Sequence, residues 1–379
     1  MHFRSVLLAC SLVCIGNPAF AQWQPDSIST ESLPTEYSSH WVWVDDMSFF
    51  HMIDGRAYLV DADSGRMLGM LSTGGIFNKL ELPADSPEIY AAATFYARGT
   101  RGERTDAITI FDRSNLSAIG EVIIPAKRHT SMATLAHSTL TDDGRFMLVY
   151  NMTPAQSVSV VNIQQREFIG EISTPGCAMI YAAGDRQFNM LCGDGSLLTV
   201  TIDDSGEEVS KVRSAPFFDP QVDPVTEKAV RFGDRWLYVS FDGIAHPVTV
   251  ADGKPEFAAI WSLISDEDRE QSWRIGGIQH LAAHQRSDLL YSLVHQGGID
   301  THKDPGTEVW VYDINAKARV QRIELANIAT SIQVSQDDEP LLLTAFIGAS
   351  ALDVYEAASG EYLRSIGELG ETIGLIQTH

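Results

Sequence analysis

A strand-and-turn signature recurs seven times along the chain and limits its fold more than any other feature. In each copy a run of β-branched or aromatic residues stops at a short polar side chain, and in most copies a turn and a second extended run follow, which is the pattern of a β-hairpin. The seven copies are 57–61, 108–112, 158–162, 198–203, 248–252, 309–313 and 352–356. Their mean spacing is about 49 residues, and a repeat of roughly 40 to 50 residues is typical of propeller blades.

Two further strands precede the hairpin in most repeats. These upstream pairs lie in 79–95, 138–151, 281–295 and 332–346, whereas the fourth and fifth repeats are irregular. Four strands in each of seven repeats predict an all-β fold, a seven-bladed β-propeller of four-stranded blades, over residues 41–379. Because an open array would leave exposed edges, the ring must close. We expect the extended tail Thr372 to Gln377 to pair with the first blade near Trp41 to Val44.

The first 21 residues have the three parts of a secretory signal. Arg4 is followed by an apolar run from Val6 to Ile15 and then by Ala19-Phe20-Ala21, a small-x-small cleavage pattern. We expect the mature chain to begin at Gln22, with residues 22–40 as an N-terminal arm. The predicted location is the periplasm.

A lipoprotein is the alternative for this segment, with Leu7-Leu8-Ala9-Cys10 as the lipobox, but little apolar sequence precedes that cysteine. No later apolar run approaches the ~20 residues that span a bilayer. The formal net charge of −23 argues against nucleic acid or an anionic membrane as partner, because both require clustered Lys and Arg. This charge fits either solubility alone or electrostatic attraction to a protein partner.

Two of the four cysteines, Cys10 and Cys14, belong to the apolar leader. The other two, Cys177 and Cys192, lie at the ends of a predicted hairpin in the fourth repeat. Because disulfides form in exported proteins, we predict a Cys177–Cys192 disulfide. The sequence has no Cys-x-x-Cys pair, so a structural bridge is favoured over a redox-active one.

A search for catalytic motifs assigns no catalytic residue to this chain. It has no His-Glu-x-x-His, Cys-x-x-Cys-His, Gly-x-Ser-x-Gly, Walker or dinucleotide motif. His280 and His284 are four residues apart, with His295 and His302 further on. In a strand, four residues span about 13 Å, which favours structural histidines over a metal site.

One group of arginines is unusual in so acidic a chain. Arg98, Arg101 and Arg104 fall within seven residues, beside Glu103 and Asp106. Their guanidinium groups could bind the carboxylates of a partner subunit in bidentate fashion. The alternative is an internal ion-pair network that braces the loop, and the sequence leaves both open.

The segment Arg101 to Asp106, followed by Ile110-Phe111-Asp112, resembles the second-blade motif in the large subunits of quinoprotein amine dehydrogenases, of the methylamine and aromatic amine (aralkylamine) types. Further matches are Phe49 with His51, Met67-Leu68-Gly69-Met70, Cys177 with Cys192-Gly193-Asp194-Gly195, Trp261-Ser262-Leu263, Trp273 with Gly276-Gly277, Thr301-His302-Lys303 and Val334-Ser335-Gln336-Asp337. The similarity is closer to the aromatic amine type. The chain departs from the pattern at Ile275, where the family tends to have proline, and before Trp41.

This resemblance implies a periplasmic heterotetramer of two large and two cysteine-rich small subunits. The small subunit would carry tryptophan tryptophylquinone, and this chain would hold no cofactor. The implied reaction converts a primary, aromatic amine to aldehyde and ammonia, with electrons passing to a blue copper protein such as azurin. The role left to this chain is to position and shield the quinone.

The resemblance also implies a role for two consecutive aromatic residues. Phe49 matches the large-subunit aromatic at the channel to the quinone, and Phe50 is beside it. Neighbouring strand residues face opposite sides, so we do not expect both rings in the core. The alternative places one ring in the core and leaves the other merely exposed.

Two other classes of function remain open. One is a stand-alone periplasmic β-propeller that binds a ligand or a protein. The other is a propeller hydrolase with acidic residues around its central channel. A neighbouring reading frame for a small, cysteine-rich, exported protein would favour the amine dehydrogenase.

Overall fold

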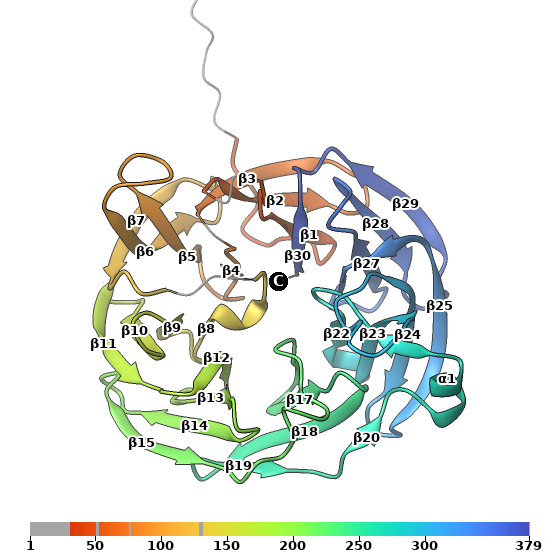
Figure 1. Ribbon diagram of the computed structural model, residues 1–379. Coiled ribbons are helices and arrows are strands. Elements are labelled where there is room, and N and C mark those ends of the chain that lie inside the picture. Colours follow the sequence, from red (N-terminus) through yellow and green to blue (C-terminus); the bar gives the residue numbers. More distant parts are fainter. Residues whose placement is uncertain (1–30, 51–52, 76, 129–131, 379) are drawn as a thin grey trace, which may run out of the picture. The chain divides into compact units, whose positions relative to one another are not determined.

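The computed structural model describes residues 31–50, 53–75, 77–128 and 132–378, and its compact unit begins at Leu33. In this unit the described strands form seven blades around a central axis (Figure 1). The predicted all-β seven-bladed β-propeller is therefore confirmed, and the fourth and fifth repeats are complete blades. The expected signal at 1–21 lies outside the described residues. Among those described, no helix is long and apolar enough to cross a membrane.

Each blade is an antiparallel sheet that extends from an inner strand near the axis to an outer strand at the rim. In this order, blade 1 contains β30 (Ile373–Gln377), β1 (Trp41–Asp46), β2 (Gly55–Asp61) and β3 (Met67–Gly74). Blade 2 contains β4 (Leu80–Glu81), β5 (Glu88–Tyr96), β6 (Arg104–Asp112) and β7 (Ala118–Ile124). Blade 3 contains β8 (Ser138–Leu140), β9 (Phe146–Asn151), β10 (Ser157–Asn162) and β11 (Glu167–Ser173). Blade 4 contains β12 (Cys177–Ala182), β13 (Gln187–Cys192), β14 (Leu197–Ile202) and β15 (Glu208–Arg213).

Blades 5 and 6 each carry one additional short strand. Blade 5 contains β16 (Val230–Phe232), β17 (Arg235–Val239), β18 (Ile244–Ala251) and β19 (Lys254–Phe257), with β20 (Trp261–Ser262) on β18. Blade 6 contains β22 (Leu281–His284), β23 (Leu289–Gln296), β24 (Gly306–Asp313) and β25 (Ala318–Ala329), with β21 (Trp273–Ile275) on β23. Blade 7 contains β26 (Ser331–Val334), β27 (Leu341–Ala345), β28 (Ala351–Glu356) and β29 (Tyr362–Gly367). The described helices are α1 (Asp266–Glu270) and the 3₁₀ turns η1 (Leu135–His137) and η2 (Gln285–Ser287).

Burial explains why the third strand of each blade gave the clearest sequence signal. All six residues of β10 are buried, because neighbouring blades cover both faces of the sheet. The outer strands are different, since only one of their faces meets a neighbouring blade. In β15, for example, exposed and half-buried residues alternate toward its end.

In most blades the polar side chain at the end of the third strand holds the following turn. The Asp112 carboxylate accepts hydrogen bonds from the backbone N–H groups of Ser114 and Asn115, at 2.8 and 3.0 Å. Asp203 binds the N–H of Ser205 in the same way, at 2.8 Å. The Ser114 and Ser205 hydroxyls also donate to these carboxylates, and these bonds, together with those from the backbone N–H groups, lower the pKa of both Asp112 and Asp203 below 3.8.

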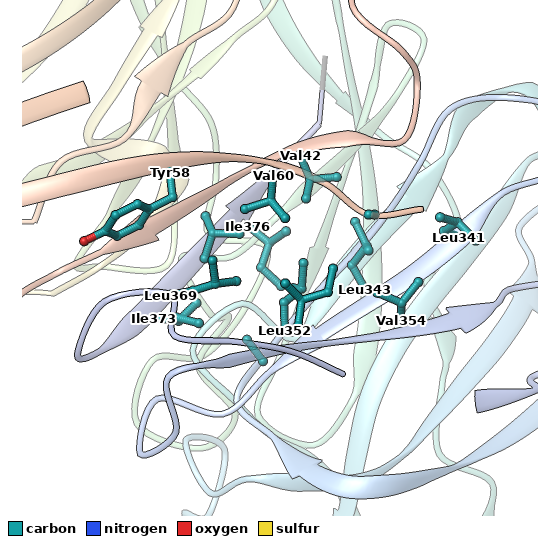
Figure 2. Packing of buried hydrophobic residues seen from close by; sticks show 14 residues of the cluster. Val42, Tyr58, Val60, Leu341, Leu343, Leu352, Val354, Leu369, Ile373 and Ile376 are labelled. Carbon is teal, nitrogen blue, oxygen red and sulfur yellow. The ribbon is translucent and has the colours of Figure 1, made fainter. Parts of the chain in front are cut away.

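The last strand of the chain closes the ring by pairing with the first. Strand β30 is antiparallel to β1, with Trp43 opposite Gln377 and Asp46 opposite Ile373. This confirms the expected closure, although the pairing covers residues 43–46 of the first strand. Figure 2 shows the result: apolar side chains of blade 1, such as Val60 and Ile376, pack against Leu343 and its neighbours in blade 7.

Two glutamine side chains connect the inner strands of different blades. The Gln377 amide accepts from the N–H of Leu80 and donates to its carbonyl, both at 2.8 Å. The Gln279 amide makes the same pair of bonds with Ile376, both at 2.9 Å. Each amide makes a pair of hydrogen bonds like those between paired β-strand residues. These bonds hold β30 to blade 2 and to the segment before β22.

A histidine also joins the first and last blades. His40 precedes β1, and its Nδ1 lies 2.9 Å from Asp63 in the turn after β2. Its Nε2 lies 2.8 Å from Asp337 in the turn after β26. Two carboxylates from blades 1 and 7 thus meet the two nitrogens of one imidazole.

Candidate functional site

The loops that join the second and third strands of the blades all emerge on one face of the ring, because every blade has the same strand order. We call this face the upper face, and the turns that join the first to the second and the third to the fourth strands form the lower face. The upper-face loops are 47–54, 97–103, 152–156, 193–196, 240–243, 297–305 and 346–350.

Phe49 and Phe50 lie on the upper face, in the loop between β1 and β2. Their side chains are 51% and 79% exposed, and their rings meet edge to face with centroids 5.8 Å apart. Neither ring is a core residue, so the alternative of one core ring does not hold. A surface hollow of about 300 Å³ at the same loop is lined by Asp46, Asp54 and Glu371, and also by Arg56, which pairs with Asp54.

Asp46 fixes the start of this loop. Its Oδ1 accepts hydrogen bonds from the N–H groups of Ser48 and Thr372, each at 2.9 Å, and its Oδ2 accepts from the N–H of Glu371 at 3.0 Å. The Thr372 hydroxyl in turn accepts from the N–H of Phe49 at 2.9 Å. The Phe49 backbone is therefore held by the segment that leads into β30.

The upper face carries further large apolar side chains that are exposed to solvent. Val222, in the connection from β15 to β16, is 77% exposed, and Ile299, in the loop between β23 and β24, is 78% exposed. Ile53 and Met152 are exposed in loops of the same face. Among the described residues, the lower-face turns carry no exposed large apolar side chain, and the others lie mainly on outer strands. Exposed apolar residues gathered on one face are typical of an interaction surface.

The three arginines at 98, 101 and 104, two in the loop between β5 and β6 and one at the start of β6, do not act together. Arg98 and Arg101 are exposed on the upper face. Arg104 points inward and binds Asp106 with two parallel hydrogen bonds of 2.8 Å. The internal network therefore accounts for Arg104, and the role of Arg98 and Arg101 as subunit contacts stays a prediction.

A buried arginine that the sequence reasoning missed completes this network. The backbone N–H of Arg128 donates to Asp106 at 2.8 Å, and its guanidinium donates to the Gly75 carbonyl at 2.9 Å and to Asn78 Oδ1 at 2.8 Å. Burial lowers the pKa of Arg128 to about 10, against the opposing charge of Asp106, so the side chain remains protonated at neutral pH. In the sequence, Arg128 was recognisable only as an arginine between two predicted blades.

The remaining residues singled out from sequence are structural. Cys177 and Cys192 form a disulfide between the paired strands β12 and β13. His280 is fully buried just before β22, and burial, with Lys228 and His302 nearby, holds its pKa well below 6.5. Over the described ranges, no group of three or more His, Cys, Asp or Glu side chains is arranged to hold a metal ion.

Comparison with known proteins places the chain in a family. The family model for the methylamine dehydrogenase heavy chain matches residues 38–379, which is nearly the whole propeller. The chain belongs to the methylamine dehydrogenase heavy chain family. It is 32% identical to the methylamine dehydrogenase heavy chain of Paracoccus versutus over 89% of this chain and 79% of the relative. It is 29% identical to that of Methylophilus methylotrophus over 96% and 88%, respectively. The chain is therefore similar to heavy subunits of an amine dehydrogenase.

Solved structures outside this family share the fold alone. The β-propeller domain of Cps50 (Swd1) from Myceliophteria thermophila has a TM-score of 0.59 at 10% identity, covering 88% of this chain and 98% of that chain. AztD from Citrobacter koseri has a TM-score of 0.52 at 12% identity, covering 89% and 98%.

Proposed function

We propose that this chain is the large subunit of a periplasmic dehydrogenase that oxidises primary aromatic amines to aldehyde and ammonia. Two copies would assemble with two cysteine-rich small subunits, and electrons would leave to a blue copper protein such as azurin. Membership of the heavy chain family supports the amine dehydrogenase, and the resemblance of Trp261-Ser262-Leu263 and Cys192-Gly193-Asp194-Gly195 supports the aromatic type.

The observation that carries this proposal is the pair Phe49 and Phe50 on the upper face. Two exposed rings, the first of them on a backbone held by Thr372, fit a surface that a partner protein covers, as do Val222 and Ile299 elsewhere on that face. The small subunit would therefore dock on the upper face. The acidic hollow at the Phe49 loop would attract a protonated amine.

Tryptophan tryptophylquinone in the small subunit would supply the electron-accepting chemistry. The two cysteines that follow the leader both belong to one disulfide, so this chain lacks the cysteines of a disulfide-rich small subunit. Its own residues would orient the substrate, exclude water and hold the partner in place. Phe49 would border the path by which the amine enters.

Co-expression with the small subunit and a visible spectrum of the purified complex test the proposal. An aromatic amine such as phenylethylamine is expected to bleach or shift a quinone band, and methylamine is expected to do so less efficiently. A colourless complex that does not respond to any amine would favour the alternative, a stand-alone periplasmic binding propeller. Hydrolysis of a test substrate by this chain alone would instead indicate the propeller hydrolase.

Replacing Phe49 with Ala tests the role of this side chain within the complex. We expect the F49A variant to change kcat/KM across a series of amines of increasing size, because a wall of the entry path is removed. Quinone formation, read from the resting spectrum, should be retained. Unchanged kinetics across the whole series would count against a channel role, and the exposed Val320 on β25 provides a matched control as V320A.

A further inference from the structure

A cavity of about 350 Å³ lies at the centre of the ring. Its walls come from inner strands and adjoining segments of several blades and are largely apolar, with Leu135, Ile180, Trp236 and Leu281 among them. Ligand pockets in proteins are commonly about 300 to 1,000 Å³, so the cavity is large enough for a small organic molecule.

The charged residues of the cavity wall are mostly cations. Lys79, Lys228 and Arg231 line it, against one carboxylate, Glu227. Arg231 is bound to both oxygens of Asp142, each at 2.6 Å. Each of the three cations has a carboxylate partner, but only the Glu227 carboxylate lines the cavity itself.

Lys228 is the wall residue with unused hydrogen-bonding capacity. Its side chain is 4% exposed, and its ammonium lies 3.1 Å from Glu227 Oε1. Apart from Glu227, no described residue offers Nζ an acceptor. An ammonium carries three N–H donors, and burying them without acceptors is costly. Acceptor atoms within the cavity would remove this cost.

Lys79 supplies a second ammonium to the same cavity. It forms an ion pair with Glu81 at 3.1 Å, and Glu81 also accepts a hydrogen bond from Ser138 Oγ at 2.6 Å. Glu81 is therefore shared between two donors, and it does not line the cavity. The Lys79 charge is only partly compensated at the cavity wall.

An apolar cluster separates the cavity from the upper face. Met47, Phe77, Ala133 and Leu375 form its centre, with Leu135, Ile278 and Ile347 packed against them. Leu135, Ile278 and Leu375 also line the cavity, whereas Met47 and Ile347 belong to upper-face loops. On the other side the wall includes Gln285 and Gln336, which lie in lower-face turns. Access to the cavity is therefore from the lower face.

We propose that the central cavity binds a small organic anion with an apolar body, such as an arylalkyl carboxylate, through the ammonium groups of Lys228 and Lys79. The carboxylate accepts from the unused Lys228 donors, and the apolar part fills the space between Trp236, Leu281 and Leu375. Because entry is from the lower face, a subunit on the upper face does not block it. The site is thus independent of the proposed dehydrogenase function.

Calorimetric titration of the full chain with phenylacetate tests this site, with neutral phenylacetamide as the matched ligand. We expect saturable binding of phenylacetate and a rise in Tm. The Lys228→Met variant should bind about ten- to hundredfold more weakly, because a hydrogen bond to a charged group contributes about 1.5 to 3 kcal/mol. Lys228→Arg should retain binding, and Lys254→Met, on the exposed edge of β19, should match the wild type.

Three results would overturn the proposal. These are no saturable phenylacetate binding by the wild type, equal affinity for phenylacetamide, or undiminished binding by a folded Lys228→Met variant. Circular dichroism verifies the fold of each variant. If Lys228→Met does not fold, the comparison of the two ligands on the wild type and on Lys228→Arg still decides the outcome.

Discussion

Asp46 is the residue on which the geometry of the Phe49 loop depends. Its carboxylate receives backbone N–H groups from its own loop and from the segment before β30. At Gly370, which has a φ of +73°, an added Cβ would lie 2.2 Å from Asp46 Oδ2, so the close approach requires glycine. The loop and the last strand are thus one structural unit.

The Asp46→Ala substitution should destabilise the fold by about 2 to 4 kcal/mol, because it leaves several backbone donors without a charged acceptor. Urea unfolding of the full chain measures this loss, and limited proteolysis should show faster cleavage within 47–54. Asp300→Asn is a matched control, since Asp300 is exposed in another upper-face loop. Equal stability of the Asp46 and Asp300 variants would contradict the anchoring role.

Arg128 is buried whereas Arg98 and Arg101 are exposed, so their substitutions should differ in their effect on stability. Arg128→Met should cost about 3 to 5 kcal/mol, because it removes a buried guanidinium and leaves the Gly75 carbonyl and Asn78 Oδ1 without that donor. Arg98→Ala and Arg101→Ala should change the free energy of unfolding by less than about 0.5 kcal/mol, as exposed residues usually do. Copurification of the small subunit with the Arg98/Arg101 double variant then tests their predicted contact role. Full retention of the partner would refute it.

At the scale of elements, the third strand of each blade could be predicted because two local signals coincide there. A run of β-branched residues that is buried on both faces of the sheet ends at an Asx turn. Both features lie within about ten residues of sequence, as in 108–115. The short inner strands gave less signal, since β4 has only two residues. The helix α1 begins after a capping residue, because the Ser265 side chain accepts a hydrogen bond from the Asp268 N–H. The formation of a helix between blades 5 and 6 depends on tertiary packing as well.

The candidate site was predictable only in part for the same reason. Two adjacent rings before a turn predicted only that Phe49 and Phe50 would not both be in the core, whereas both are exposed, and the resemblance supplied their expected role. The anchor of the loop could not be seen, because Asp46 and Thr372 are 326 positions apart. Arg128 and Lys228 were also missed, since an isolated basic residue in a connection does not reveal that packing will bury it.

Substitution of Gln377 in the inner strand β30 tests how much the closure of the ring contributes to stability. Gln377→Ala removes both amide bonds to Leu80 and leaves a buried N–H and a carbonyl unpaired, which should cost about 2 to 4 kcal/mol. The midpoint of urea unfolding should fall accordingly. Gln221→Ala, at an exposed position in the connection from β15 to β16, should leave it unchanged. A midpoint equal to that of the wild type for Gln377→Ala would show that the amide contributes little.

At the scale of the whole molecule, the junction of blades 1 and 7 should respond to pH through His40. Burial lowers the pKa of His40, but the hydrogen bond and charge of Asp63, with the charge of Asp337, outweigh it and raise the pKa above 6.5. Protonation supplies an N–H donor to each carboxylate. The resulting stabilisation is complete below the unfolded pKa near 6.5 and is lost as pH rises through the folded pKa.

The stability difference between the wild type and His40→Gln should therefore shrink as pH rises from below 6.5 through the raised folded pKa of His40. Urea unfolding at several pH values measures it, and His246→Gln serves as the control, because burial lowers the pKa of His246 instead. A difference that stays constant or grows toward alkaline pH would contradict a charged His40.

The pairing of Trp43 with Gln377 also determines when the protein can finish folding during its synthesis. Roughly 330 residues separate the two strands, and at about 5 to 20 residues per second a ribosome needs on the order of 20 to 70 s to make them. Throughout that time the first blade of a nascent chain has an open edge at β1. The growing polypeptide therefore depends on chaperones, or on delayed folding, to avoid pairing that edge with another copy.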